Sequence, residues 1–225
     1  MQAALKGKNC MKKFIAACII SSSLFFSSCD PAATFDKPQP EDKKSLGSFP
    51  DNLQGNYLAT DQSSIVTVTG QLVTRHYDVD YKAHKDSIGS SYKIVADTLI
   101  NLTDGSREKI LLKGDTVIQH ADWTDTIFNI PAGNVLKKFK GYYFLNCHYG
   151  DSSWEVKKLS LKKDVLTIAG ISAPEDIYKL KEITETTADT VSTRFTLTRK
   201  QFKGFVKQGG FAEQETFIRM QKSEQ

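Results

Sequence analysis

Alternation of apolar and polar residues with a period of two runs through much of the chain from about residue 51 to residue 221, and it constrains the fold more than any other feature. In the segment SSIVTVTGQLV, Val66 and Val68 oppose Ile65 and Thr67. Successive side chains of a β-strand point to opposite faces, so this pattern predicts strands with one buried face. Gly70 then marks the turn of a predicted hairpin.

Short polar turns separate the predicted strands. Two examples are Lys113-Gly114-Asp115 and Lys162-Lys163-Asp164, each of which lies between two alternating segments. Strands that follow one another through short turns form an antiparallel meander. We therefore predict a mainly β fold, an antiparallel meander that forms a barrel-like or half-barrel sheet, with an open sheet or a sandwich as the alternative.

One short pattern occurs twice. Residues 53–57 (LQGNY) and 139–143 (FKGYY) both place Tyr two residues after Gly, and each opens a series of strands. The pattern resembles the first strand of lipocalin-like barrels, in which an aromatic residue after the glycine closes the floor of the barrel. Lipocalins usually have Trp where both copies here have Tyr. The resemblance implies a barrel rather than an open sheet.

Helix signals are confined to the C-terminal part. Thr198 and Gln201 form a capping box, Phe202 and Phe205 fall on one helical face, and Gly209-Gly210 ends the segment, which predicts a short helix over residues 199–208. The segment FAEQETFIRM that follows returns to a strand pattern. A second capping box, formed by Ser172 and Glu175 around Pro174, indicates a further turn of helix.

The first 28 residues have the composition of an export signal. They hold four lysines and no acidic residue, and translation could start at Met1 or at Met11. The apolar stretch from Phe14 to Phe26 has only 13 residues, whereas a membrane-spanning helix needs about 20. It fits the apolar region of a signal peptide, residues 1–28, better than a transmembrane helix.

The end of this leader, Phe26-Ser27-Ser28-Cys29, resembles a bacterial lipobox, with Phe where Leu is usual. The resemblance implies cleavage before Cys29, acylation of Cys29 and anchoring to lipid of the outer membrane. Several acyl chains anchor a protein stably, because each buried methylene contributes about 0.8 kcal/mol. The alternative is an ordinary cysteine after a simple secretory signal.

Residues 29–50 contain four prolines and little apolar periodicity. Such a segment is typical of an extended tether. We therefore predict a flexible tether over residues 29–50 and a single β-rich domain over residues 51–221, long enough to bury a core.

Removal of the leader changes the charge and the cysteine content of the chain. It takes four of the 30 Lys and Arg residues and leaves 26 basic against 26 acidic residues. A nucleic-acid partner is not expected, because nothing remains of the basic excess. Of the four cysteines, only Cys147 then stays in the domain as a thiol, and we interpret it as a small buried apolar residue rather than a reactive group.

The best polar row is His76, Asp78 and Asp80, which would share one face of a strand while Tyr77 lies on the other. Such a row could bind a divalent metal, but no second group of ligands is visible to complete a shell, so we expect no metal and no cofactor. The alternative is a solvent-facing row. Trp123 and Trp154 are candidates for a carbohydrate or lipid platform, with core packing as the alternative.

Five tripeptides resemble the Asp-Ser/Thr-apolar acceptor pattern for O-glycosylation of exported proteins in Bacteroidota. The same pattern also arises where a turn leads into a strand, so both interpretations stay open. The candidate acceptors are Ser87, Thr98, Thr116, Thr126 and Thr190.

No catalytic motif is recognisable in the sequence. We therefore expect a lipid-anchored envelope protein without enzymatic activity, which binds a small hydrophobic or carbohydrate ligand or serves an envelope assembly as an accessory protein. The alternative is a lipid-anchored hydrolase that acts on carbohydrates, whose catalytic carboxylates would be distant in sequence.

Overall fold

The computed structural model describes residues 31–150, 152–185 and 194–221. Instead of the single domain predicted for residues 51–221, the chain forms two compact units. We call residues 78–123 the small unit, and residues 30–77 with 124–225 the main unit. Two long strands pass from one unit into the other, β5 (Leu72–His84) and β10 (Thr116–Asn129). The small unit separates because it has a core of its own, around Leu99, Ile110 and Val117.

The main unit is built on a large sheet that is not closed into a barrel, which confirms the predicted mainly β meander. Its order is β2-β11-β12-β13-β14-β16-β3-β4-β5-β10. The predicted turn at Gly70 joins β4 to β5, and the turn at residues 162–164 joins β13 to β14. The remaining bounds are β2 (Ser45–Leu46), β3 (Gly55–Ala59), β4 (Ile65–Val68), β11 (Val135–Phe139), β12 (Tyr142–Tyr149), β13 (Ser153–Lys162), β14 (Val165–Gly170) and β16 (Glu213–Arg219).

The inner face of this sheet holds the larger core, which includes Val66, Leu145, Leu159 and Phe217. Tyr57, in the first copy of the repeated pattern, is fully buried there, and its hydroxyl donates to the carbonyl of Leu53, 2.7 Å away. Leu53 ends the short 3-10 helix η1 (Asp51–Leu53).

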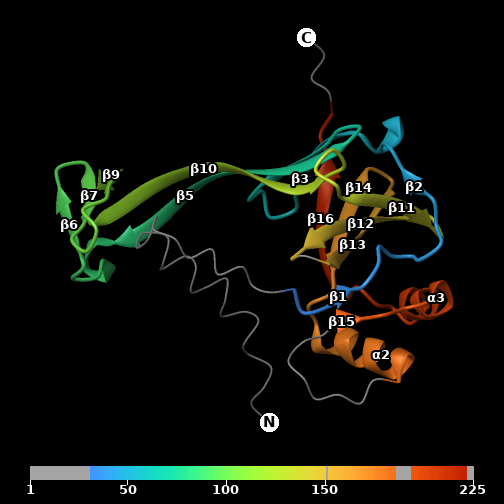
Figure 1. Ribbon diagram of the computed structural model, residues 1–225. Helices are drawn as coiled ribbons and strands as arrows, with labels where there is room; N and C mark the ends of the chain where they lie inside the picture. Colours follow the sequence, from blue (N-terminus) through green and yellow to red (C-terminus); the bar gives the residue numbers. More distant parts are fainter. Residues whose placement is uncertain (1–30, 151, 186–193, 222–225) are drawn as a thin grey trace. The chain divides into compact units, whose positions relative to one another are not determined.

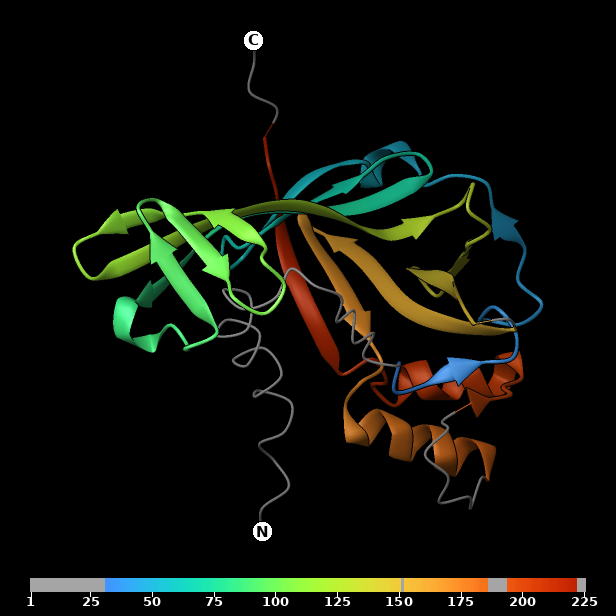
Figure 2. The same ribbon diagram turned by 60° about the vertical axis from the view of Figure 1, so that its left-hand side comes forward.

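Two helices cover the outer face, α2 (Pro174–Thr184) and α3 (Arg199–Lys207). Figures 1 and 2 show both on one side of the sheet, together with the short strands β1 (Thr34–Phe35) and β15 (Arg194–Phe195). The predicted capping box of Thr198 and Gln201 is confirmed at the start of α3. The second predicted box is wrong, because α2 begins after Ala173 without a side-chain cap and has Pro174 in its first turn.

The predicted tether is also wrong for the part that the structure describes. From residue 31 to residue 50 the chain runs over the main unit, where Phe35 and Phe49 are buried. Asn146 accepts a hydrogen bond from the backbone N–H of Gln39 and donates one to its carbonyl. Lys137 donates to the carbonyls of the prolines on either side of Gln39. A few well-placed contacts thus order a segment that has no strand periodicity.

The small unit contains a three-stranded antiparallel sheet in the order β6-β7-β8, a fourth short strand, β9, that pairs with β10, and the 3-10 helix η2 (Lys85–Ser87). The predicted turn at residues 113–115 joins β9 to β10. No helix within the described ranges of either unit is long and apolar enough to cross a membrane. The apolar stretch 14–26 lies outside the described residues. The strand bounds are β6 (Tyr92–Val95), β7 (Thr98–Asn101), β8 (Arg107–Lys109) and β9 (Leu111–Lys113).

Candidate functional site

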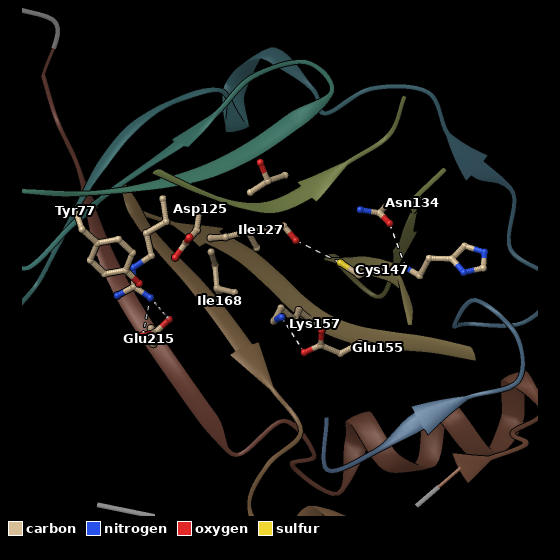
Figure 3. Close-up of a pocket in the computed structure, with 12 residues that line it drawn as sticks. Tyr77, Asp125, Ile127, Asn134, Cys147, Glu155, Lys157, Ile168 and Glu215 are labelled. Carbon is tan, nitrogen blue, oxygen red and sulfur yellow. Dashed lines mark hydrogen bonds and ion pairs between the residues drawn. The ribbon is translucent and has the colours of Figure 1, made fainter. Parts of the chain in front are cut away.

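A cavity of about 460 Å³ lies on the inner face of the main sheet, beside the larger core. Figure 3 shows the side chains that line it, which come from β5, β10, β12, β13, β14 and β16 and from Asn134, directly before β11. Ile127 and Ile168 supply apolar surface. The charged lining residues are Arg75, Asp125, Glu155, Lys157 and Glu215.

The position of the cavity follows from a change in residue type along the inward-facing positions of several strands. On β16, Glu215 lies two residues before the buried Phe217 and on the same face. On β13, Lys157 likewise lies two residues before the buried Leu159. On β5, Val73 gives way to Arg75. The inner face is therefore apolar at one end and charged at the other, and the cavity occupies the charged end.

Arg75 is held rigidly at one wall of this cavity. Its Nη1 donates to both carboxylate oxygens of Glu215, each 2.9 Å away, and its Nε donates to Ser64 Oγ at 2.8 Å. The guanidinium also lies 4.8 Å from the centre of the Tyr77 ring. Such contacts fix the guanidinium plane before any ligand arrives. Because Arg75 Nη2 has no hydrogen-bond partner among the described residues, it can donate to a ligand.

A second ion pair lies on β13, where Lys157 Nζ is 2.7 Å from Glu155 Oε1. Both side chains are about one-third exposed. Asp125, from β10, adds a third carboxylate to the lining, as Figure 3 shows. The cavity therefore offers acceptors and donors side by side, on an apolar base.

Cys147 lines the cavity from β12, opposite Glu155 on the neighbouring strand. Its Sγ donates to the carbonyl of Ile127, 3.3 Å away. Burial raises the pKa of the Cys147 thiol to about 11. His148, the next residue, packs against Trp154 with ring centres 4.2 Å apart and ring planes tilted by 49°, so the sequence neighbours do not act as a nucleophile and its base. The interpretation of Cys147 as an unreactive residue agrees with this environment.

We expect native Cys147 to react with iodoacetamide at least tenfold more slowly at pH 8 than the same thiol in unfolded protein. A pKa near 11 lowers the thiolate fraction by about two orders of magnitude relative to an ordinary thiol, and the greater nucleophilicity of such a thiolate recovers about one. The rate should keep rising up to about pH 11. Mass spectrometry of the alkylated chain measures it, and a rate that levels off near pH 8.5 would contradict the buried thiol.

The predicted polar row of His76, Asp78 and Asp80 lies on one strand, β5, as expected. His76 is in the main unit, where its Nδ1 lies 3.1 Å from Thr124 Oγ1. Asp78 and Asp80 belong to the small unit and are exposed beside His120, whose Nδ1 lies 3.7 and 3.2 Å from their respective carboxylates. Both carboxylates are exposed to solvent, and ligand binding by this row stays a prediction. Among the described residues there is no group of three side chains that could hold a metal ion.

The two tryptophans belong to different units. Trp123 is in the small unit and is 37% exposed. Trp154 packs on the outer-face core of the main unit, pairs with Phe35 of β1 and does not line the cavity. Core packing, the alternative that the sequence left open, therefore explains Trp154.

The sequence analysis missed Arg75 and Glu215, although it considered their neighbours. Arg75 and Tyr77 lie on the face of β5 opposite the predicted polar row, where they follow the buried Val73. A cation in an inward-facing register is the signal that could have identified the site. Its partner Glu215 lies 140 residues further along the chain, and only the folded sheet brings the two together.

The candidate acceptors for O-glycosylation occupy different settings. Thr98 and Thr116 each begin a strand directly after a turn, as the structural alternative predicts. The Ser87 hydroxyl donates to the carbonyl of His84, and Thr126 lines the cavity. Thr190 lies outside the described residues. The modification itself stays a prediction.

Comparisons of this chain with protein-family models, with curated proteins and with solved structures found no match.

Proposed function

We propose that this protein is a lipid-anchored envelope protein that binds a small polar ligand, such as a sugar, in the cavity of its main unit. The leader and the lipobox-like sequence before Cys29 support the anchor. The observation that supports ligand binding is the charged cavity. Its preorganised donors and acceptors are Arg75 with Glu215 and Lys157 with Glu155.

The packing around Arg219 supports this proposal. Arg219, the last residue of β16, lies with its guanidinium 4.7 Å from the centre of the Tyr57 ring. It also donates to the carbonyls of Gln54 and Asn52, at 2.8 and 2.6 Å. These contacts tie β16 to β3 and to η1, at the end of the core away from Glu215. An inner face that is packed with apolar side chains at one end and lined by charged ones at the other suits a ligand that enters from the charged end.

The lining favours a sugar-like ligand over a purely hydrophobic one. Burial of an apolar molecule against five charged side chains would remove water from those charges without replacing their hydrogen bonds. Hydroxyl groups both donate and accept, so they can satisfy the Glu155–Lys157 pair and the Nη2 of Arg75 together. The Tyr77 ring provides apolar surface for the face of a sugar ring.

One observation favours a second candidate, a glycoside hydrolase. Asp125, Glu155 and Glu215 come from three different strands and line the same cavity, as sequence-distant catalytic carboxylates would. Two of the three are committed to ion pairs with Lys157 and Arg75, which is why we place binding first. The two candidates differ in outcome, because a hydrolase would release reducing ends from an oligosaccharide that the protein binds.

The test is calorimetric titration with a panel of neutral, acidic and amino sugars and their short oligomers. For a sugar that binds, Lys157→Gln should weaken binding about tenfold or more, because a hydrogen bond to a charged group contributes about 1.5–3 kcal/mol. Lys162→Gln removes an exposed lysine from the same strand and should leave binding unchanged. The proposal fails if no sugar binds at millimolar concentration, or if the two variants bind equally well.

A further inference from the structure

The outer face of α3 carries a stripe of four cations. Arg199, Lys200, Lys203 and Lys207 are all exposed. At 3.6 residues per turn they fall within an arc of about 100° around the helix axis. The residues that α3 buries, Phe202 and Phe205, lie on the other side, against the outer-face core. We call these four cations the α3 basic face.

The charge of the α3 basic face is not compensated nearby. The helix contains no acidic residue. The neighbouring helix α2 has exposed acidic side chains, yet within the described residues none of the four α3 cations takes part in an ion pair. The mature chain has equal numbers of acidic and basic residues, so this face is a local concentration of positive charge and not a general excess.

The chain that leads from the predicted anchor packs on the same outer-face core as α3. Ala33 is 2% exposed and belongs to the same outer-face core as Phe202 and Phe205 of α3. Only three residues lie between Cys29 and Ala33, so the chain between them reaches at most about 14 Å. Phe35, two residues further on, is fully buried in this core. An acyl group on Cys29 would thus hold this side of the main unit near the lipid, without a long tether between them.

We infer that the α3 basic face docks on anionic lipid headgroups when Cys29 is anchored in the membrane, an inference that rests on the proposed lipid anchor. Cations near an anionic surface are attracted within about one Debye length, roughly 8–10 Å at ordinary salt. The long stems of lysine and arginine let the charged groups reach the headgroups while the helix stays packed on its core. Docking would fix the orientation of the main unit, whereas a single flexible attachment would leave it free to rotate.

The first test uses acylated wild-type protein in vesicles of phosphatidylcholine, alone or in equal parts with phosphatidylglycerol. An amine-reactive label, read by peptide mass spectrometry, reports the accessibility of each lysine. Labelling of Lys200, Lys203 and Lys207 should fall several-fold on the anionic vesicles only, and high salt should restore it. Four exposed lysines of the small unit serve as internal controls and should not change: Lys82, Lys93, Lys109 and Lys113.

Equal labelling of the α3 lysines on both kinds of vesicle would overturn the inference. A fall on neutral vesicles as large as that on anionic ones would also overturn it, because simple proximity to the bilayer would then explain the protection. A fall at the small-unit lysines of the same size would assign the effect to net charge rather than to α3.

A second test separates this inference from the anchor. The unacylated chain of residues 29–225 with Cys29→Ala keeps every residue that the structure describes, and it should float with phosphatidylglycerol vesicles but not with phosphatidylcholine vesicles. The R199Q/K200Q/K203Q/K207Q variant should lose this flotation, and the matched K82Q/K93Q/K109Q/K113Q variant should keep it. If wild-type protein from the native host carries no acyl chain, the proposed lipid anchor is wrong. The flotation experiment then decides by itself whether the α3 basic face binds anionic lipid.

Discussion

A Cys29→Ala substitution should move the protein almost completely from the membrane fraction to the soluble exported fraction of its native host. The lipobox-like sequence implies several acyl chains on this one residue, and the substitution removes the thiol that would carry the thioether-linked chains. Chains that each bury a dozen or more methylenes at about 0.8 kcal/mol anchor a protein in effect irreversibly. The contribution of the α3 basic face is far smaller and salt-sensitive, so it should not retain the variant in fractions washed with high salt.

Intact mass spectrometry gives the decisive measurement. The wild-type chain should begin at Cys29 and carry the mass of its acyl chains, and the variant should lack that mass. Cys147→Ala is the matched control, because it removes a cysteine from the cavity without touching the anchor. If the wild-type protein is soluble and not acylated, the lipoprotein proposal is wrong, and the protein is exported without an anchor.

Local patterns predicted the regular elements well, because the physics behind them is local. Alternation in residues 65–68 requires only that one face be buried, and the hairpin at Gly70 follows from it. The capping box at Thr198 is complete within four residues, and α3 begins where it predicts. The capping box predicted at Ser172 is not formed, although its residue types fit the pattern. Pro174 sets the first turn of α2 without a side-chain cap, so Ser172 and Glu175 had no capping role to fill.

Non-local contacts decided what the sequence could not predict. Residues 31–50 lack periodicity because they do not form a long strand, and they are ordered by partners such as Asn146, 107 residues away. The division into two units depends on where the long strands β5 and β10 leave the main core, which alternation alone does not mark. The cavity combines side chains from six strands, and its clearest ion pair joins Arg75 to Glu215.

The same non-local packing leads to a large effect on stability at a position that the sequence assigned to a flexible tether. Phe35→Ala should lower the free energy of unfolding by about 3–5 kcal/mol, the usual cost of removing a fully buried phenylalanine. Phe35 pairs with both Trp154 and Phe195, and its ring centre lies 6.4 Å from that of Phe195. Urea unfolding, followed by the fluorescence of the adjacent Trp154, measures the loss.

Lys44→Ala is the matched control within the same segment, because Lys44 is exposed. Its effect should stay within about 0.5 kcal/mol, as for surface substitutions in general. If Phe35→Ala is as harmless as Lys44→Ala, residues 31–50 are a tether after all, and the short link between Cys29 and the α3 side of the main unit disappears. If Phe35→Ala has the predicted cost, the segment is part of the fold, and the anchor holds this side of the protein within a few residues of the lipid.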